Sequence, residues 1–190
     1  MVSRVIQVVF LMLLSVAAKA DGLVAELAND SARVLYSTQL WGQEAGPLEI
    51  EMGFLFNEDD NYLYNLGVMV RNDNLDSPVI ISIGGRGYAA KAGHSSGDVD
   101  IVALALGGDV LLVPDTLGGL GLGFHFFGAP SVVTGGDAEG LMEYGARLDY
   151  QVTPQANVYW GYQKIIADIE NTSEDATINS GFQIGVGIRF

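Results

Sequence analysis

Charged side chains, glycines and one histidine share the face of the chain that alternates with its apolar residues. We expect this set to line a common interior, where five acidic and four basic groups nearly cancel. They are Glu49, Glu51, Asp109, Glu143 and Asp149 with Arg71, Arg86, Arg147 and Arg189, and His125 lies among them. Because unpaired charge is costly in a low-dielectric interior, the set predicts a salt-bridged network that plugs the interior. The alternative is a narrow path for ions or small solutes along the same groups.

Hydrolysis is the second chemistry to weigh, and only His94 and His125 are available as its base. His94 lies in the glycine-bounded segment 93–97 with two serines, and Asp98 and Asp100 follow. A Ser-His-Asp hydrolase holds these groups within hydrogen-bond reach, which a flexible loop does not do. The chain has no cysteine, so thiol catalysis, cysteine-ligated zinc and disulfides are excluded. We predict a protein that is not an enzyme and has no cofactor or metal, with a membrane-embedded lipid hydrolase as a minor alternative.

Apolar residues alternate with the charged and glycine-rich set along almost the whole chain after residue 20. Alternation with a period of two is typical of strands, and no segment shows a convincing helical period. Turn signals rich in Gly, Pro, Asn and Asp separate nine such segments. The expected strands are near 32–41, 47–56, 61–71, 78–90, 98–113, 117–128, 138–151, 156–166 and 177–190. A short segment at 22–27 supplies a tenth strand, which an outer-membrane barrel with both chain ends on one side requires.

Two features indicate that the apolar set faces lipid. A soluble barrel has no reason for so many glycines on its outer surface, whereas a narrow interior needs small residues. On the apolar face, aromatic residues gather toward the strand ends and aliphatic residues lie between them, as in outer-membrane barrels. We therefore predict an all-β fold, a transmembrane antiparallel up-and-down β-barrel of ten strands. Eight strands is the alternative, and a secreted soluble barrel or sandwich is the minor one.

The first 20 residues carry a targeting signal. Arg4 precedes an apolar run at 5–18, and Ala18-Lys19-Ala20 is a small-residue cleavage motif, which together form a secretory signal peptide. The run is shorter than the ~18 apolar residues of a membrane-spanning helix. Residues 21–190 then form the barrel domain. The net charge of −14 argues against nucleic acid as a partner, because phosphate binding needs basic patches.

Several short segments resemble a known family. They are Ala25–Leu27, Ile83–Tyr88, Gly107–Gly108, Tyr159–Tyr162 and Gly185–Phe190. Their layout resembles the YfaZ-type family of small bacterial outer-membrane β-barrel proteins. The resemblance implies an integral membrane protein without catalytic residues, in the outer membrane of Gram-negative bacteria, reached through the periplasm. A narrow channel or uptake barrel for small or hydrophobic solutes is the alternative function.

The C-terminal segment resembles the signature that the barrel-assembly machinery reads in this class of proteins. That resemblance implies Phe190 as an assembly signal. It also implies the assembly machinery and periplasmic chaperones as partners during biogenesis, with outer-membrane lipid and lipopolysaccharide as the surroundings of the mature protein.

The direction of the last strand fixes the expected side of every turn. If Phe190 lies at the periplasm, the turns at 114–118 and 153–154 are periplasmic, and the connections at 128–136 and 170–175 are outside. Counting along the strands then puts Arg86 and Glu143 at one level of the interior. We expect them to pair directly or through His125 and Gln183.

Overall fold

Ten antiparallel strands close into a barrel in the computed structural model, which describes residues 22–41, 48–72, 77–94, 97–170 and 175–190. The predicted signal peptide lies outside the described residues. The barrel strands are β1 (Gly22–Ala28), β2 (Ser31–Trp41), β3 (Leu48–Asn57), β4 (Tyr62–Asn72), β5 (Val79–His94), β6 (Gly97–Leu112), β7 (Leu120–Ala129), β9 (Ala138–Thr153), β10 (Ala156–Ile169) and β11 (Asp175–Arg189). The short elements are η1 (Asp115–Leu117), η2 (Ser131–Val133) and β8 (Thr134–Gly136).

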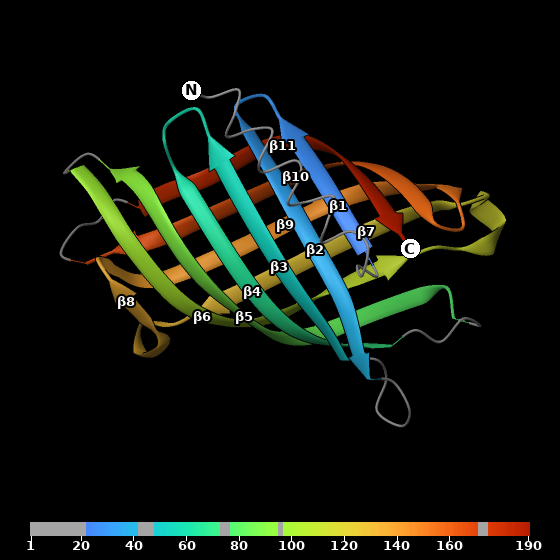
Figure 1. Ribbon diagram of the computed structural model, residues 1–190, viewed down its shortest axis with the longest axis horizontal. Coiled ribbons are helices and arrows are strands. Elements are labelled where there is room, and N and C mark those ends of the chain that lie inside the picture. Colours follow the sequence, from blue (N-terminus) through green and yellow to red (C-terminus); the bar gives the residue numbers. More distant parts are fainter. Residues whose placement is uncertain (1–21, 42–47, 73–76, 95–96, 171–174) are drawn as a thin grey trace.

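Each barrel strand pairs with its neighbours in sequence, and β1 pairs with β11 to close the ring. The small strand β8 pairs only with β6 among the described strands, and β7 is hydrogen-bonded directly to β9. The front wall, β1 to β5, and the rear wall, β7 to β11, cross in Figure 1, as tilted strands do on the two sides of a barrel. The up-and-down barrel of ten strands is confirmed, with the short first strand as its tenth member. Eight strands are excluded.

The predicted strand bounds need three corrections. β5 and β6 pair residue by residue as far as His94 opposite Gly97, so β5 runs four residues past the predicted end at 90. β10 likewise continues to Ile169 rather than 166. β7 begins later than predicted, because Gly118 and Gly119 have φ values of 59° and 92°, which belong to a turn and not to a strand. The elements η1, η2 and β8 were not predicted.

The outward face of the barrel is an apolar belt. Leu106 and Ile83 are 71 % and 66 % exposed, and the neighbouring strands expose aliphatic and aromatic side chains at every second position. Trp160 stacks on Phe182 at 5.2 Å between ring centroids, across the β10–β11 pair. Such a belt is costly in water and stable in lipid, so the fold is that of an outer-membrane β-barrel. Among the described residues, no helix is both long enough and apolar enough to cross a membrane.

The interior has two unlike halves, which we name by the ends of the barrel. The terminal end carries Gly22, Arg189 and the β9–β10 turn, and the far end carries the β3–β4 turn and the segment from η2 to β8. The far half is filled by buried apolar side chains with exposed fractions of 0 to 7 %. They are Leu55, Leu63, Tyr88, Ala92, Val99, Ile101, Ala103, Ala105, Phe127, Ala129, Ala138, Leu141, Ile165, Ala167, Ile169, Ala176 and Ile178. We call this group the apolar plug.

The barrel is also narrowed across its width. β5 and β11 lie on opposite sides of the ring, yet their Cα atoms come within 8 Å of each other. Small residues of these strands, such as Ala92 and Ala176, are buried between the walls. The walls can therefore approach and pack on each other, much as the two sheets of a sandwich do.

The short β3–β4 turn fastens the far end. The Asn57 side-chain amide donates to the Ile178 carbonyl of β11 at 3.1 Å, and the Asn57 side-chain oxygen accepts from the Asn61 backbone at 3.0 Å. The Asn61 side chain in turn accepts from the Gly93 backbone of β5 at 2.7 Å. This turn thus ties β3, β5 and β11 together across the mouth.

Candidate functional site: a buried charge cluster and its cavity

Glu143 is the centre of a charge cluster halfway along the interior. Its carboxylate accepts from Arg33 at 2.9 Å, from Gln163 at 2.6 Å and from Arg86 at 3.0 Å, and the Tyr88 hydroxyl donates to it as well. These partners come from β2, β5 and β10, so the cluster joins opposite walls of the barrel. Only 1 % of Glu143 is exposed. A carboxylate buried this deeply is tolerated because charged and hydroxyl donors surround it.

Arg86 links the cluster to the apolar plug. Its guanidinium also donates to Glu51 on β3, which makes Arg86 a bridge between two carboxylates. The same group lies 3.8 Å above the centre of the Phe127 ring. A planar guanidinium can form ion pairs at its edge and stack on an aromatic face at once, which a lysine cannot do.

Arg33 and Glu26 extend the cluster to β1 and β2. A second nitrogen of Arg33 donates to Asn65 at 3.2 Å, and its Nε lies 4.0 Å from Glu26 Oε2. The other Glu26 oxygen accepts from the Tyr159 hydroxyl. Glu26 and Arg33 are 5 % and 4 % exposed, so this is a second buried carboxylate with a compensating base beside it.

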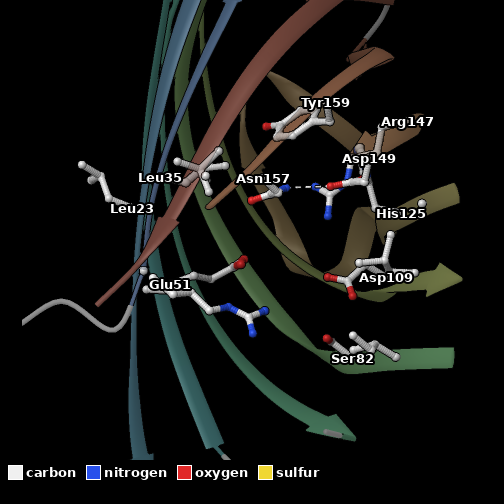
Figure 2. A pocket seen from close by; sticks show the side chains of 18 of the residues that line it. Leu23, Leu35, Glu51, Ser82, Asp109, His125, Arg147, Asp149, Asn157 and Tyr159 are labelled. Atoms are coloured by element: carbon white, nitrogen blue, oxygen red, sulfur yellow. Dashed lines mark hydrogen bonds and ion pairs between the residues drawn. The ribbon is translucent and has the colours of Figure 1, made fainter. Parts of the chain in front are cut away.

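A cavity of about 360 Å³ occupies the terminal half of the interior, and the cluster forms its floor. Glu26, Arg33, Arg86, Glu143 and Gln163 line it at depth. Turn residues at the terminal end, among them 153–155, line it at the mouth. In Figure 2, Glu51 lies on one side of this space, with Asp109 and Ser82 on the opposite side. The cavity therefore reaches from the terminal end to the middle of the barrel and stops at the cluster.

Two further charged groups line the cavity nearer its mouth. Arg147 donates to Asp149 at 2.8 Å, and Asn157 donates to the other oxygen of Asp149 at 2.7 Å (Figure 2). The Arg147 guanidinium also lies 4.9 Å from the Tyr159 ring centre. Arg71 and Glu49 pair at 3.6 Å on the opposite wall.

Glycines on the inner face make room for these long side chains. A Cβ on Gly145 would collide with the His125 ring, and one on Gly185 would collide with the Tyr159 ring. In the same way, a Cβ on Gly123 would lie only 2.9 Å from Arg147 Cγ. The glycine-rich inner face thus follows from close packing: a large polar side chain of one strand lies over a glycine of its neighbour.

All ten charged or histidine residues of the predicted interior set line this cavity. The direct Arg86–Glu143 pair is present at 3.0 Å, and His125 Nε2 lies 3.8 Å from Glu143. The predicted participation of Gln183 needs correction, because the amide that donates to Glu143 is that of Gln163 on β10. Phe190 follows β11 at the terminal end, where its side chain is 64 % exposed.

Sequence reasoning missed Glu26 and Arg33. The segment 22–28 was treated only as a short closing strand, and Arg33 was not assigned to a face. Their signal was available: in strands with a period of two, Glu26 and Arg33 alternate with Leu27 and Val34 and so belong to the inner set. With these two residues the cavity wall holds six acidic and five basic groups.

In the described part of the chain, no side chains are arranged as a hydrolase centre or as a metal site. Residues 95 and 96, which follow His94, lie outside it. His125 contacts the charge cluster and the Gly145 backbone position. No three metal-ligating side chains converge among the described residues.

The chain is similar to three solved membrane proteins. The similarity spans 89 % of this chain in each case. It covers 98 % of the NanC porin, with 9 % sequence identity and a TM-score of 0.37, and 92 % of Neisserial surface protein A (NspA), with 15 % identity and a TM-score of 0.35. It covers 96 % of the Acinetobacter baumannii outer membrane protein Omp33, with 14 % identity and a TM-score of 0.40. No curated protein matches the chain.

A family model described as YfaZ precursor matches residues 2–190. That span includes the N-terminal segment and every strand of the barrel. The resemblance inferred from the short glycine-rich segments is confirmed, and the chain belongs to the YfaZ family.

Proposed function

We propose that this protein resides in the bacterial outer membrane as a non-conducting barrel that presents a polar cavity to the periplasm. The observation that carries the proposal is the contrast between the two halves of the interior. The far half is a packed apolar plug with exposed fractions of 0 to 7 %, and the terminal half is a cavity of about 360 Å³. A continuous path for ions would need polar groups and water along its whole length.

Three features support closure toward the far end. The plug contains Leu63, Phe127 and Ile165, each 0 % exposed. The charge cluster closes the bottom of the cavity with groups that are bonded to each other. The β3–β4 turn bonds across the far mouth. A narrow channel, the alternative function, would have to open all three.

We assign no catalytic role to the cluster. Glu143 is its most buried carboxylate, and both of its oxygens already accept hydrogen bonds from arginine. A general base needs a free lone pair within reach of the proton that it removes. Glu143 is instead suited to holding opposite walls together.

The terminal end faces the periplasm in this proposal, because the last strand ends there and Phe190 is the proposed assembly signal. In the outer membrane, the apolar belt contacts lipid and the far end contacts lipopolysaccharide. The net charge of −14 comes in part from acidic residues at the far turns, such as Asp59, Asp98 and Glu139.

Single cysteines test the side on which the cavity opens, and the absence of native cysteine makes each label unambiguous. Val132 lies in η2 at the far end and is 86 % exposed, whereas Ser37 lines the cavity mouth opposite Gly22. We expect Val132→Cys to react with a bulky impermeant maleimide in intact cells. Ser37→Cys should react only after the outer membrane is permeabilised. Equal labelling of Ser37→Cys in intact cells would contradict the proposed orientation.

A further inference from the structure

We propose that the outer surface of β9, β10 and β11 binds a phosphate-bearing lipid, and that Lys164 is the residue that contacts the phosphate. The inference rests on the proposed function in one respect, since it requires the far half of the belt to lie in the outer leaflet. The lipid anchor of the lipopolysaccharide in that leaflet carries phosphate. The inference is drawn from a cation without a protein partner, the hydroxyl groups beside it and the aromatic surface next to it.

Lys164 is a basic residue on the lipid-facing side of β10. It alternates with the buried residues Gln163 and Ile165, which point into the barrel, and it shares its face with Trp160 and Tyr162. Its side chain is only partly exposed. A lysine on the lipid face is costly at the middle of the bilayer and is tolerated where its ammonium reaches the headgroups. Lys164 therefore marks the level at which β10 meets the headgroups.

The ammonium group of Lys164 has no partner in the described part of the chain. Lys91, the other lysine there, pairs with Asp98 at 2.9 Å, whereas Lys164 forms no ion pair or side-chain hydrogen bond with a described residue. Asp168 lies four residues further along the same face, but its carboxylate lies against β9, 2.7 Å from where a Cβ on Gly140 would be. Lys164 is thus left to pair with a group outside the protein.

Hydroxyl groups flank Lys164 on both neighbouring strands. In the register, Lys164 lies opposite Tyr144 of β9 and opposite Ser180 of β11, and opposite residues on one face have Cβ atoms ~5 Å apart. Ser180 Oγ lies 3.0 Å from the Tyr162 hydroxyl, and the Tyr144 hydroxyl has no hydrogen bond to a described residue. An ammonium group with several hydroxyl donors suits a phosphate, because its charged oxygens accept several hydrogen bonds at once.

Aromatic rings cover the same face on the side of Lys164 that leads toward the terminal end. Trp160 stacks on Phe182 with the two rings 3° from parallel, and Tyr162 meets Phe182 edge-on at 5.4 Å between centroids. Both rings of the stack are about half exposed. Trp160 lies four residues from Lys164, which is ~13 Å along a strand. A lipid with its phosphate at Lys164 would therefore lay part of an acyl chain over this aromatic surface.

A lipid phosphate suits this surface better than a free anion or a bridging metal ion does. The net charge of −14 repels soluble anions, whereas a lipid is kept beside the belt by its own chains. No group of His, Asp and Glu side chains among the described residues is arranged to hold a metal ion. The direct ion pair between Lys164 and the phosphate is therefore the contact that the surface offers.

Quenching of Trp160 fluorescence by brominated lipid tests the proposal. The Trp41→Phe barrel keeps Trp160 as its only tryptophan. It is placed in phosphatidylcholine nanodiscs, in buffer with EDTA, that contain mid-chain-brominated phosphatidic acid or phosphatidylcholine. Phosphatidic acid supplies a phosphomonoester headgroup. We expect it to associate with the surface roughly fivefold better than phosphatidylcholine, the effect of one lysine at a charged membrane surface. Equal association of the two lipids would overturn the proposal.

Substitutions at the two lysines locate the site. Lys164→Gln should reduce the preference for phosphatidic acid to less than about twofold, and Lys164→Arg should retain it. Lys91→Gln is the matched control, because it makes the same change in net charge at a lysine that is already paired. It should leave the preference unchanged. Equal losses in Lys164→Gln and Lys91→Gln would overturn the proposal, since only the overall charge would then matter.

Salt provides a test that needs no substitution at Lys164. The preference of the Trp41→Phe barrel should fall as the salt concentration rises, because an ion pair at the headgroups is screened. A preference that salt does not change would contradict the ion pair.

Two further results would assign the surface to another ligand. A preference that appears with magnesium but not in EDTA would mean that a metal ion bridges the lipid to carboxylates such as Asp168. Loss of the preference in excess inorganic phosphate would mean a site for a free anion. Both leaflets of the nanodisc hold the same lipids, so none of these results depends on which end faces the periplasm. Failure here is therefore distinct from failure of the cysteine labelling.

Discussion

Glu143 is the residue on which the interior depends most. Its carboxylate compensates Arg33 and Arg86 and accepts a hydrogen bond from the Gln163 amide, so side chains from four strands, β2, β5, β9 and β10, meet at one buried group. Removing one partner of a buried ion pair leaves the other charges without compensation, which is far more costly than never having had the pair. The surrounding residues are held by the same group, so the loss spreads across the cluster.

Glu143→Ala should therefore lower the free energy of unfolding by ~3–5 kcal/mol. Reversible urea unfolding in lipid vesicles, followed by the gel shift between folded and unfolded barrel, measures this. Glu49→Ala is the control, since its pair with Arg71 is partly exposed and spans 3.6 Å. Equal, small losses in both variants would show that the central cluster is not a stabilising element.

At the scale of the strands, glycine has two distinct roles. On the inner face, Gly145 has the Tyr162 carbonyl 2.6 Å from the position of a Cβ and the His125 ring still closer. On the outer face of β5, a Cβ on Gly87 would lie 3.7 Å from its nearest neighbour, at ordinary contact distance. The first glycine is required by packing within the barrel, and the second is not.

Gly145→Ala should destabilise the barrel by ~1–3 kcal/mol, because the neighbouring strand or His125 must shift. Gly87→Ala should be neutral or stabilise it by up to ~1 kcal/mol, since alanine restricts the unfolded chain without strain in the folded one. The same unfolding assay compares the pair. A loss in Gly87→Ala that matches the loss in Gly145→Ala would mean that outer-face glycines are also structural.

The strands were predictable from sequence because one face of nearly every strand is apolar and the other is not. The same rule assigned the charges of the cavity to one interior and paired Arg86 with Glu143. It failed in the far half, where residues such as Leu63 and Ile165 point inward while their neighbours on the outer face are also apolar. Alternation of polarity carries no information there, so the apolar plug could not be read from the pattern.

Contacts between strands on opposite sides of the interior were the other feature that could not be predicted from the sequence. The choice of Gln163 over Gln183 as the partner of Glu143 depends on strand tilt and on the direction of each side chain, which level counting ignores. The hydrogen bond from Asn57 to the Ile178 carbonyl depends on β11 reaching the far end of the barrel beside the β3–β4 turn. The bulge in β11 near Ile178 helps to set the position of that carbonyl. Local sequence does not specify either distance.

At the scale of the whole molecule, the belt and the interior must have opposite tolerance for charge. Leu122 lies on the outer face of β7 and is exposed to the surroundings of the belt, whereas Gln151 lies at the mouth of the cavity. A charged side chain on the lipid face of a barrel is destabilising, most strongly near the middle of the bilayer.

Leu122→Arg should therefore cost ~2–4 kcal/mol or block insertion, while Gln151→Arg should leave folding close to wild type. Folding yield into vesicles after dilution from urea gives both numbers. If Gln151→Arg abolished folding and Leu122→Arg did not, the inward and outward faces would be the reverse of those described.

Single-channel recording in planar bilayers tests the central claim, that the apolar plug and the charge cluster close the barrel. The Val132→Cys barrel, which is otherwise wild type and whose insertion is shown by maleimide labelling, should give no steady ionic current across the voltages at which a general porin in the same bilayer conducts, and the wild-type protein should behave in the same way. A steady, high conductance from the wild-type barrel would contradict the claim, because it would require a continuous aqueous path through a plug whose residues are at most 7 % exposed.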